Sequence, residues 1–293
     1  MEAKLIKGRI LKGIGGFYYV LTDEGIIEAK GRGIFKNDGI KLAVGDMVEL
    51  EKTEDGKGVI NEIHPRKNQF IRPPIVNVDT FIVVFAPAHP KPNYMLIDKF
   101  LIMAEMNGIE PVLCLNKCDL VSEEDVEEIR SIYEGIYPIL TVSCQTGQGL
   151  DQLQEMVSGK KAALAGPSGV GKSTILNNLH PEANMETGAV SQKTRRGKHT
   201  TRHVEIFQLE GGGMIYDTPG FTSFEILEAE EDNLASFYPE MDLIRGQCRY
   251  DDCRHVSEPE CAVRAAVKTG KIHKKRYDSY LANLDEIRTR RKY

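Results

Sequence analysis

The segment GPSGVGKS at residues 166–173 decides how the rest of the chain is interpreted. It fits the pattern G-x-x-x-x-G-K-[ST], whose glycines let backbone N–H groups point at phosphate oxygens beside the positive end of a helix. An apolar strand pattern at 161–165 precedes the segment, and a helical pattern at 172–179 follows it. This strand–loop–helix context predicts a phosphate-binding loop rather than a glycine-rich turn with an incidental lysine.

The residues of this loop have separate expected tasks. Lys172 is predicted to reach the β and γ phosphates of a nucleotide and to serve catalysis, while the Ser173 hydroxyl is predicted to ligate Mg²⁺. The predicted nucleotide-binding residues here are Gly166, Pro167, Ser168, Gly169, Val170, Gly171, Lys172, Ser173 and Thr174.

A second motif, Asn116-Lys117-Cys118-Asp119, follows the apolar strand pattern at 111–115. It therefore lies at the carboxyl end of a strand, where ligands bind in open α/β sheets. The Asp119 carboxylate is suited to accept hydrogen bonds from N1 and the exocyclic amine of guanine, whereas adenine offers no matching pair of donors. Alone, the motif could be a surface turn. Beside a phosphate loop it indicates GTP and argues against the alternative of a generic ATPase.

Two shorter segments complete the predicted nucleotide site. The sequence SCQ at 143–145 resembles the base-supporting SAK loop, with Cys144 in place of alanine and glutamine in place of lysine, so Ser143 and Cys144 are expected to border the base. The sequence DTPG at 217–220 fits the DxxG loop. In such a loop, Asp217 is expected to hold Mg²⁺ through water and the Gly220 N–H to meet the γ-phosphate; taken alone, the segment could be an ordinary turn.

A cysteine and histidine cluster lies near the C-terminal end of the sequence. Three thiols and one imidazole make a complete tetrahedral shell for structural Zn²⁺, and buried thiols without a metal are the alternative. The candidate ligands are Cys248, Cys253, His255 and Cys261. Cys114, Cys118 and Cys144 have no fourth ligand nearby in the sequence and are expected to be ordinary core or loop residues.

The patterns divide the chain into three parts. Residues 1–65 contain five short alternating runs with glycine-rich turns, which predict an all-β, OB-like or SH3-like barrel that either contacts RNA or is purely structural. Residues 66–225 alternate strands and helices and predict an α/β domain with a mostly parallel sheet. Residues 226–293 predict a mainly helical module that carries the cysteines.

The expected elements are as follows. Strands are predicted at 5–11, 16–22, 25–30, 46–51, 58–63, 80–85, 110–115, 138–142, 161–165, 204–209 and 214–216. Helices are predicted at 95–106, 123–133, 150–157 and 172–179.

Composition and charge set further bounds. The 293 residues are 41% hydrophobic and 28% charged, and no run approaches the roughly 18 apolar residues of a membrane span. No signal peptide is recognisable, so a cytoplasmic protein is expected. Ten basic and three acidic residues give 264–293 a charge of +7, which leaves −12 for the remainder, and 193–202 forms a second basic cluster. Such blocks contact polyanions or are merely solvated.

The order of the motifs is unusual. Most GTPases run from phosphate loop through DxxG to NKxD and SAK, whereas here 116–119 and 143–145 precede 166–173 and 217–220. This order indicates a circular permutation that keeps the spatial order of the sheet. With the barrel before it and the Cys/His module after it, the chain resembles the RsgA (YjeQ/YloQ) family of bacterial ribosome-assembly GTPases over nearly its whole length.

The resemblance implies a set of expectations. They are GTP hydrolysis to GDP stimulated by the small (30S) ribosomal subunit, 16S-type rRNA as a partner, a role in late maturation, and a zinc ion on the four ligands named above. No membrane partner is expected, and the protein is expected to be a monomer. A GTP-regulated RNA-binding scaffold with incidental hydrolysis is the alternative.

The resemblance also places the first switch in the segment RGKHTT at 196–201. Phe221 follows DTPG where Ras-like enzymes carry the glutamine that orients water, so another residue must do this. His199 is the candidate catalytic residue, with an exposed or RNA-contacting histidine as the alternative. Thr200 or Thr201 is expected to complete the Mg²⁺ shell.

Overall fold

The computed structural model describes residues 5–37, 39–71, 73–181, 204–218 and 229–290. The chain forms two compact units. Unit 1 combines 1–80, 154–164 and 173–221, and unit 2 combines 81–153, 165–172 and 222–293. The boundaries expected after residues 65 and 225 stay predictions.

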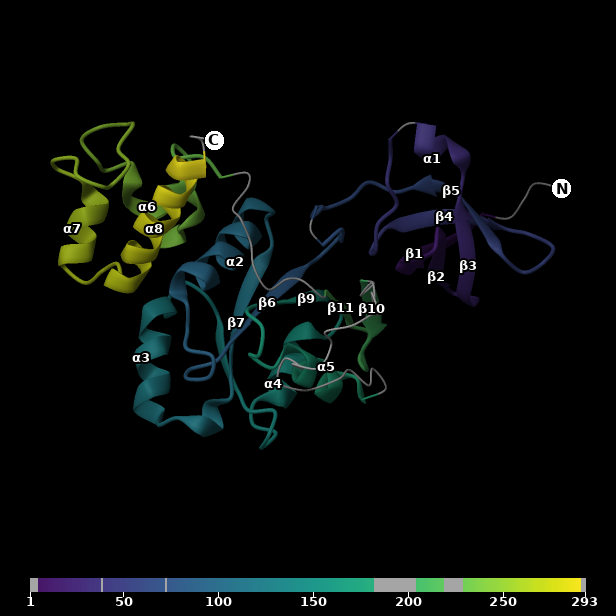
Figure 1. The fold of residues 1–293 in the computed structure, drawn as a ribbon, viewed down its shortest axis with the longest axis horizontal. Coiled ribbons are helices and arrows are strands. Elements are labelled where there is room, and N and C mark those ends of the chain that lie inside the picture. The colour runs from purple at the N-terminus through teal and green to yellow at the C-terminus, as the bar shows by residue number, and fades with distance from the viewer. Residues whose placement is uncertain (1–4, 38, 72, 182–203, 219–228, 291–293) are drawn as a thin grey trace, which may run out of the picture. The chain divides into compact units, whose positions relative to one another are not determined.

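A five-stranded barrel begins unit 1 (Figure 1). Its strands follow the order β2-β3-β5-β4-β1, and β1 also pairs with β2, which closes the barrel. A short helix α1 (Gly33–Asn37), which the sequence patterns did not predict, lies between β3 and β4 in the chain. The predicted OB-like barrel is confirmed, and its strands are β1 (Leu5–Ile14), β2 (Phe17–Thr22), β3 (Gly25–Gly31), β4 (Met47–Lys52) and β5 (Gly58–Ile63).

The barrel strands follow from alternation and turn chemistry. In β2, Val20 is fully buried and Tyr18 packs against the same core, so every second side chain points inward. The turn between β1 and β2 contains Gly15 and Gly16 at φ +59° and +85°. Two consecutive residues with positive φ are what a tight two-residue hairpin needs, and glycine adopts them without strain.

Three further strands of unit 1 extend from the barrel. Strand β10 (Glu205–Gln208) pairs antiparallel with β1 and with β11 (Met214–Asp217), and β11 pairs parallel with β9 (Lys161–Ala165). Helix α4 (Leu150–Val157) precedes β9, and helix α5 (Lys172–Leu179) follows it. The sequence predicted all three strands and both helices.

Unit 2 contains the strands that carry the base motif. Strand β6 (Thr80–Phe85) is buried along its whole length, and β7 (Glu110–Asn116) runs parallel to β8 (Ile139–Val142). Helix α2 (Tyr94–Met106) begins at the Asn93 cap. Helix α3 (Glu123–Tyr133) begins at a capping box in which Ser122 and Asp125 satisfy each other's backbone N–H groups. The predicted α/β domain, circularly permuted, is confirmed.

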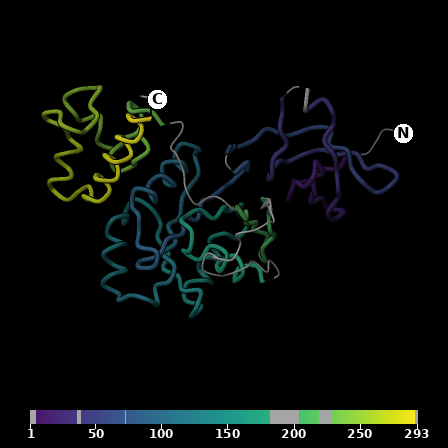
Figure 2. Tube along the Cα trace, in the orientation of Figure 1, coloured from purple at the N-terminus to yellow at the C-terminus, as the bar shows by residue number. Residues whose placement is uncertain are grey.

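The C-terminal part of unit 2 is helical, as predicted, and is the green-to-yellow end of the trace in Figure 2. It comprises a 3₁₀ turn η3 (Leu234–Phe237) and helices α6 (Pro239–Arg245), α7 (Ala262–Lys268) and α8 (Lys274–Arg290). Tyr238, Met241 and Tyr280 lie fully buried in its core. Helix α8 is the longest described helix, and none in the described part of the chain combines the length and apolar character that crossing a membrane requires.

Several basic residues of 264–293 have acidic partners within the protein. Lys274 pairs with Asp278 at 2.6 Å, Lys275 with Glu128 at 2.8 Å and Arg288 with Glu231 at 2.9 Å. Asp278 is already counted in the charge of +7, but Glu128 and Glu231 lie outside the segment, so +7 overstates the positive surface that 264–293 offers to a polyanion.

Candidate functional site

The phosphate loop joins the end of β9 to the start of α5, and its backbone tolerates only glycine at two positions. Gly166 has φ +138°, and a Cβ there would lie 2.0 Å from the Val84 carbonyl oxygen in β6. Gly171 has φ +99°, and its Cβ would lie 2.3 Å from Nδ2 of Asn116. Gly166 and Gly171 are therefore favoured by close approach as well as by backbone conformation.

Lys172, the first residue of α5, lies against its own loop. Its Nζ donates hydrogen bonds to the carbonyl oxygens of Gly166 at 2.7 Å and Pro167 at 2.6 Å. Val170 is buried, and Ser173 and Thr174 occupy the first turn of α5. The ammonium group and the helix N-terminus thus gather at one loop, which is the arrangement that binds phosphate.

The base motif contacts the phosphate loop directly. Asn116 ends β7, and its Nδ2 donates to the Val170 carbonyl at 2.8 Å. Lys117 takes the left-handed conformation at φ 68°, and its Nζ donates to the carbonyls of Gly169 at 2.6 Å and His89 at 2.8 Å. Lys117 thereby joins three segments that are far apart in sequence. The role of His89 was not predicted, because a backbone carbonyl carries no sequence signal.

Asp119 lies in the 3₁₀ turn η1 (Cys118–Leu120), and a serine fixes its orientation. Ser143, buried just after β8, donates its hydroxyl to Asp119 Oδ1 at 2.6 Å. This bond joins the NKCD and SCQ segments, a contact that the sequence did not predict. Asn116 Oδ1 is buried and has no hydrogen-bond partner among the described residues, which leaves an acceptor open beside this turn.

The thiols near the base motif carry no charge at neutral pH. Burial, followed by the nearby Asp119 charge, raises the pKa of Cys144 to about 11. Burial also raises the pKa of Cys118, whose Sγ donates to the Leu115 carbonyl at 3.0 Å. These cysteines therefore act as small neutral side chains, as expected from the sequence.

Asp217 is the last residue of β11 in unit 1. The next residue, Thr218, donates its hydroxyl to the Leu164 carbonyl at 3.1 Å. The preceding residue, Tyr216, is buried and donates to the Val76 carbonyl at 2.7 Å. The remaining predicted residues of the hydrolytic site, His199, Thr200, Thr201 and Gly220, lie outside the described residues.

The four predicted metal ligands lie together in unit 2. Their ligand atoms are all within 4.8 Å of one another, so the cluster could hold a metal ion. His255 Nδ1 lies 3.4 Å from Sγ of both Cys253 and Cys261 and 3.6 Å from that of Cys248, and the sulfurs of Cys248 and Cys261 are 3.9 Å apart. A tetrahedral zinc ion requires about 3.5 Å between nitrogen and sulfur ligands and about 3.8 Å between sulfurs. The donor set therefore fits zinc.

Neighbouring groups hold these ligands in place. His255 has φ +59°, and its carbonyl accepts a 2.6 Å hydrogen bond from the Tyr277 hydroxyl of α8. Cys261 caps α7 by accepting from the Arg264 N–H at 3.4 Å. Burial lowers the pKa of His255, which favours the neutral imidazole that metal binding needs.

A buried ion network in unit 2 was not predicted. Arg276 of α8 donates to Asp98 of α2 and, at 2.8 Å, to Glu240 of α6, and both Arg276 and Asp98 are at most 1% exposed. The guanidinium also lies 4.6 Å from the ring centroid of Tyr238 and 5.4 Å from that of Tyr133 in α3. Two carboxylates overcome the effect of burial and raise the pKa of Arg276 well above its usual value. One side chain therefore ties α8 to three other elements.

Comparisons with known proteins place this chain in a family. The family model described as "RsgA GTPase" matches residues 63–227, and that of the "RsgA N-terminal domain" matches 7–60. "Small ribosomal subunit biogenesis GTPase RsgA" from Alkaliphilus metalliredigens is 46% identical over 98% of this chain and 99% of its own length, and its Caldanaerobacter subterraneus counterpart is 45% identical over 98% and 97%.

Two solved structures extend the comparison. YjeQ from Thermotoga maritima has a TM-score of 0.85 and 36% identity, covering 97% of this chain and 99% of its own. "YloQ, a circularly permuted GTPase" has a TM-score of 0.81 and 34% identity, covering 98% and 96%.

Proposed function

The chain belongs to the RsgA GTPase family, and from this premise we propose that it hydrolyses GTP during biogenesis of the small (30S) ribosomal subunit. The observation that carries the proposal is the Lys117 bridge. Its 2.6 Å bond to Gly169 joins the NKCD segment, proposed to recognise the base, to the loop proposed to bind the phosphates. The curated relatives bear the ribosomal function in their names, and this chain matches them over nearly its full length.

The proposed roles follow from the chemistry of each group. Asp119 accepts the two guanine N–H groups, held in orientation by Ser143. Lys172 leaves its loop carbonyls and contacts the β and γ phosphates. Ser173, Asp217 and either Thr200 or Thr201 hold Mg²⁺, which supplies charge neutralisation on the phosphates when bound. His199 positions or deprotonates the attacking water.

The proposed partner is the small subunit through its 16S-type rRNA, in the cytoplasm, with the chain acting as a monomer. An OB-like barrel is a fold that commonly binds oligonucleotides, which supports an RNA contact by residues 1–65. Part of the basic charge of 264–293 is paired internally, so the RNA contact of the C-terminal module is confined to the residues left unpaired.

We further propose that the Cys/His cluster binds one structural zinc ion. Structural zinc supplies about 10–16 kcal/mol to small modules. Cys253→Ser is therefore expected to abolish zinc binding and to lower the melting temperature. The measurement is the zinc-to-protein ratio of the purified full chain together with thermal unfolding. Cys144→Ser is the matched control and is expected to keep one zinc per chain. A zinc ratio near one in Cys253→Ser would contradict the assignment.

The test of the proposed function is the rate of GTP hydrolysis with and without purified small subunits. The first switch lies in a charged segment, so we expect slow turnover alone and a large increase of kcat with small subunits. ATP as substrate and large subunits as additive are the controls, and neither should support the increase. In the same assay, His199→Ala is expected to bind GTP normally but to lose the stimulated turnover.

The competing function is a GTP-regulated RNA-binding scaffold whose hydrolysis is incidental. Equal kcat with and without small subunits, together with normal GTP binding, would favour the scaffold. If small subunits still raise the kcat of His199→Ala to the value of the unchanged protein, another residue carries the catalytic role.

A further inference from the structure

Lys12 of the barrel, Glu205 and Asp217 form a row across three neighbouring strands of unit 1. In the register of the sheet of unit 1, Lys12 of β1 lies opposite Glu205 of β10, and Glu205 lies opposite Asp217 of β11. Directly opposed residues of antiparallel strands point to the same face of a sheet. The side chains of Lys12, Glu205 and Asp217 therefore lie side by side. Asp217 is the residue proposed to hold Mg²⁺.

The charges in this row require compensation. Two carboxylates directly opposite each other on neighbouring strands destabilise the pairing, and Glu205 faces Asp217 in this way. Lys12 Nζ lies 2.7 Å from Glu205 Oε1, and both side chains are about one-third exposed. Lys12 thus neutralises Glu205 from the side opposite to Asp217.

The backbone of this row has little freedom to move the two carboxylates apart. Tyr216 projects from the other face of β11 and bonds the Val76 carbonyl, close to Gly45 of the barrel. Arg9 and Asn77 both donate to the Gly45 carbonyl, at 2.9 and 3.0 Å. Tyr216 thus anchors β11 to the segment at Val76, and Lys12 is the cation that pairs with Glu205 in this row.

We propose that Lys12 is a positioning residue for the nucleotide site, which acts by neutralising Glu205 beside Asp217. The inference rests on the proposed role of Asp217 in holding Mg²⁺. Without Lys12, an uncompensated carboxylate stands next to a site that must accept the anionic Mg·GTP complex. The barrel then sets part of the electrostatic potential of the nucleotide site, in addition to any contact with RNA.

The test is a set of Lys12 and Glu205 variants of the full chain, assayed for GTP hydrolysis at saturating Mg²⁺ and low ionic strength. Opposed like charges cost up to about 1 kcal/mol, which corresponds to about a fivefold change. Lys12→Met is expected to raise KM for GTP about three- to fivefold with little effect on kcat, and Lys12→Glu to raise it further. Lys12→Arg is expected to behave as the unchanged protein.

Glu205→Gln separates charge neutralisation from a merely structural role. If Lys12 acts by compensating Glu205, the double variant Lys12→Met/Glu205→Gln restores KM to within about twofold, because the row then carries the same net charge as in the unchanged protein. Half a molar salt is also expected to reduce the effect of Lys12→Met. A double variant with KM as high as that of Lys12→Met would overturn the proposal.

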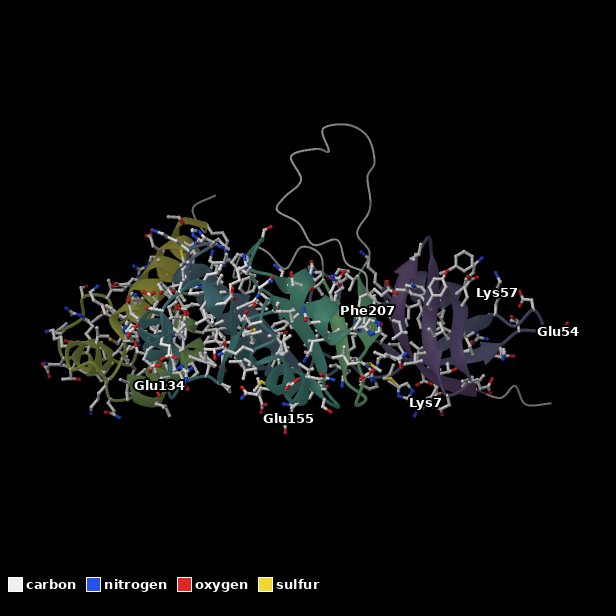
Figure 3. All side chains as sticks on the ribbon, turned by 90° about the horizontal axis from the view of Figure 1, so that it is seen from below. Lys7, Glu54, Lys57, Glu134, Glu155 and Phe207 are labelled. Atoms are coloured by element: carbon white, nitrogen blue, oxygen red, sulfur yellow. The ribbon has the colours of Figure 1, made fainter. Side chains whose placement is uncertain are left out.

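Lys57→Met is the matched control. Lys57 also forms a barrel ion pair, with Glu28 at 2.8 Å, and Figure 3 shows it beside Glu54 and well apart from Phe207 of β10. Its removal is expected to leave KM unchanged. An equal rise of KM in Lys57→Met and Lys12→Met would refute a specific role of Lys12. Absence of GTP hydrolysis in the unchanged protein would instead contradict the proposed function itself.

Discussion

Asp119→Asn is expected to lower the affinity for GTP by about 10³-fold or more and to create affinity for xanthosine triphosphate. Sites built around hydrogen bonds reject a mismatched partner by about 10⁴–10⁵. Asparagine presents a donor to the guanine amine, whereas the carbonyl that xanthine carries at the same position accepts from it. The Ser143 hydroxyl donates to Oδ1 of Asp119. It can donate to the corresponding oxygen of asparagine, so the substituted side chain is held in the same orientation.

The measurement is equilibrium binding of fluorescent GTP and xanthosine triphosphate to both proteins. Glu124→Gln is the control, since it removes an exposed carboxylate in the first turn of α3, a few residues further along the chain. Its affinities should equal those of the unchanged protein. GTP binding by Asp119→Asn within tenfold of the original would show that the base is recognised elsewhere.

Arg276→Met is expected to destabilise the protein by about 3–5 kcal/mol, the cost of breaking a buried ion pair by removing one partner. The substitution leaves Asp98 and Glu240 facing each other without the guanidinium, with Asp98 completely buried. It also removes the cation from its contact with the Tyr238 ring. The loss should appear as a lower urea midpoint of unfolding.

Two comparisons show whether charge causes this loss. Arg245→Met breaks an exposed pair with Asp242 on α6 and is expected to change stability by less than about 1 kcal/mol. The triple variant Arg276→Met/Asp98→Leu/Glu240→Leu removes all three charges and is expected to recover much of the stability. If Arg276→Met unfolds at the same urea concentration as Arg245→Met, the network does not stabilise the fold.

The regular elements were predictable because their signals are local. The fully apolar run of β6 lies where the sequence predicted it, and the Ser122–Asp125 capping box begins the helix predicted at 123–133. The glycines and the lysine of the phosphate loop are likewise adjacent in the chain. The four metal ligands lie within fourteen residues of the sequence, and their ligand atoms are within 4.8 Å of one another in the structure. Helix α1, five residues long, had no pattern strong enough to predict it, and α6, α7 and α8 were expected only as a mainly helical segment without bounds.

The contacts that join distant segments were not predictable from one sequence. Lys12 and Glu205 are 193 positions apart, and each alone is an ordinary charged residue on a strand. Arg276 was counted with the basic residues of 264–293, because nothing in its neighbours in the sequence shows that Asp98 and Glu240 surround it. Pairing of this kind depends on how the elements pack, and packing is set by the whole chain rather than by a window of residues.

The Arg276 network also has a consequence for biosynthesis. Asp98 and its partner Arg276 are separated by 178 positions. At a translation rate of about 5–20 residues per second, the aspartate is made roughly 9–36 s before the arginine. During that interval the Asp98 carboxylate has no Arg276 guanidinium to pair with. A prematurely terminated chain that lacks residue 276 never forms this ion pair, and we expect it to be cleaved by proteases faster than the complete chain.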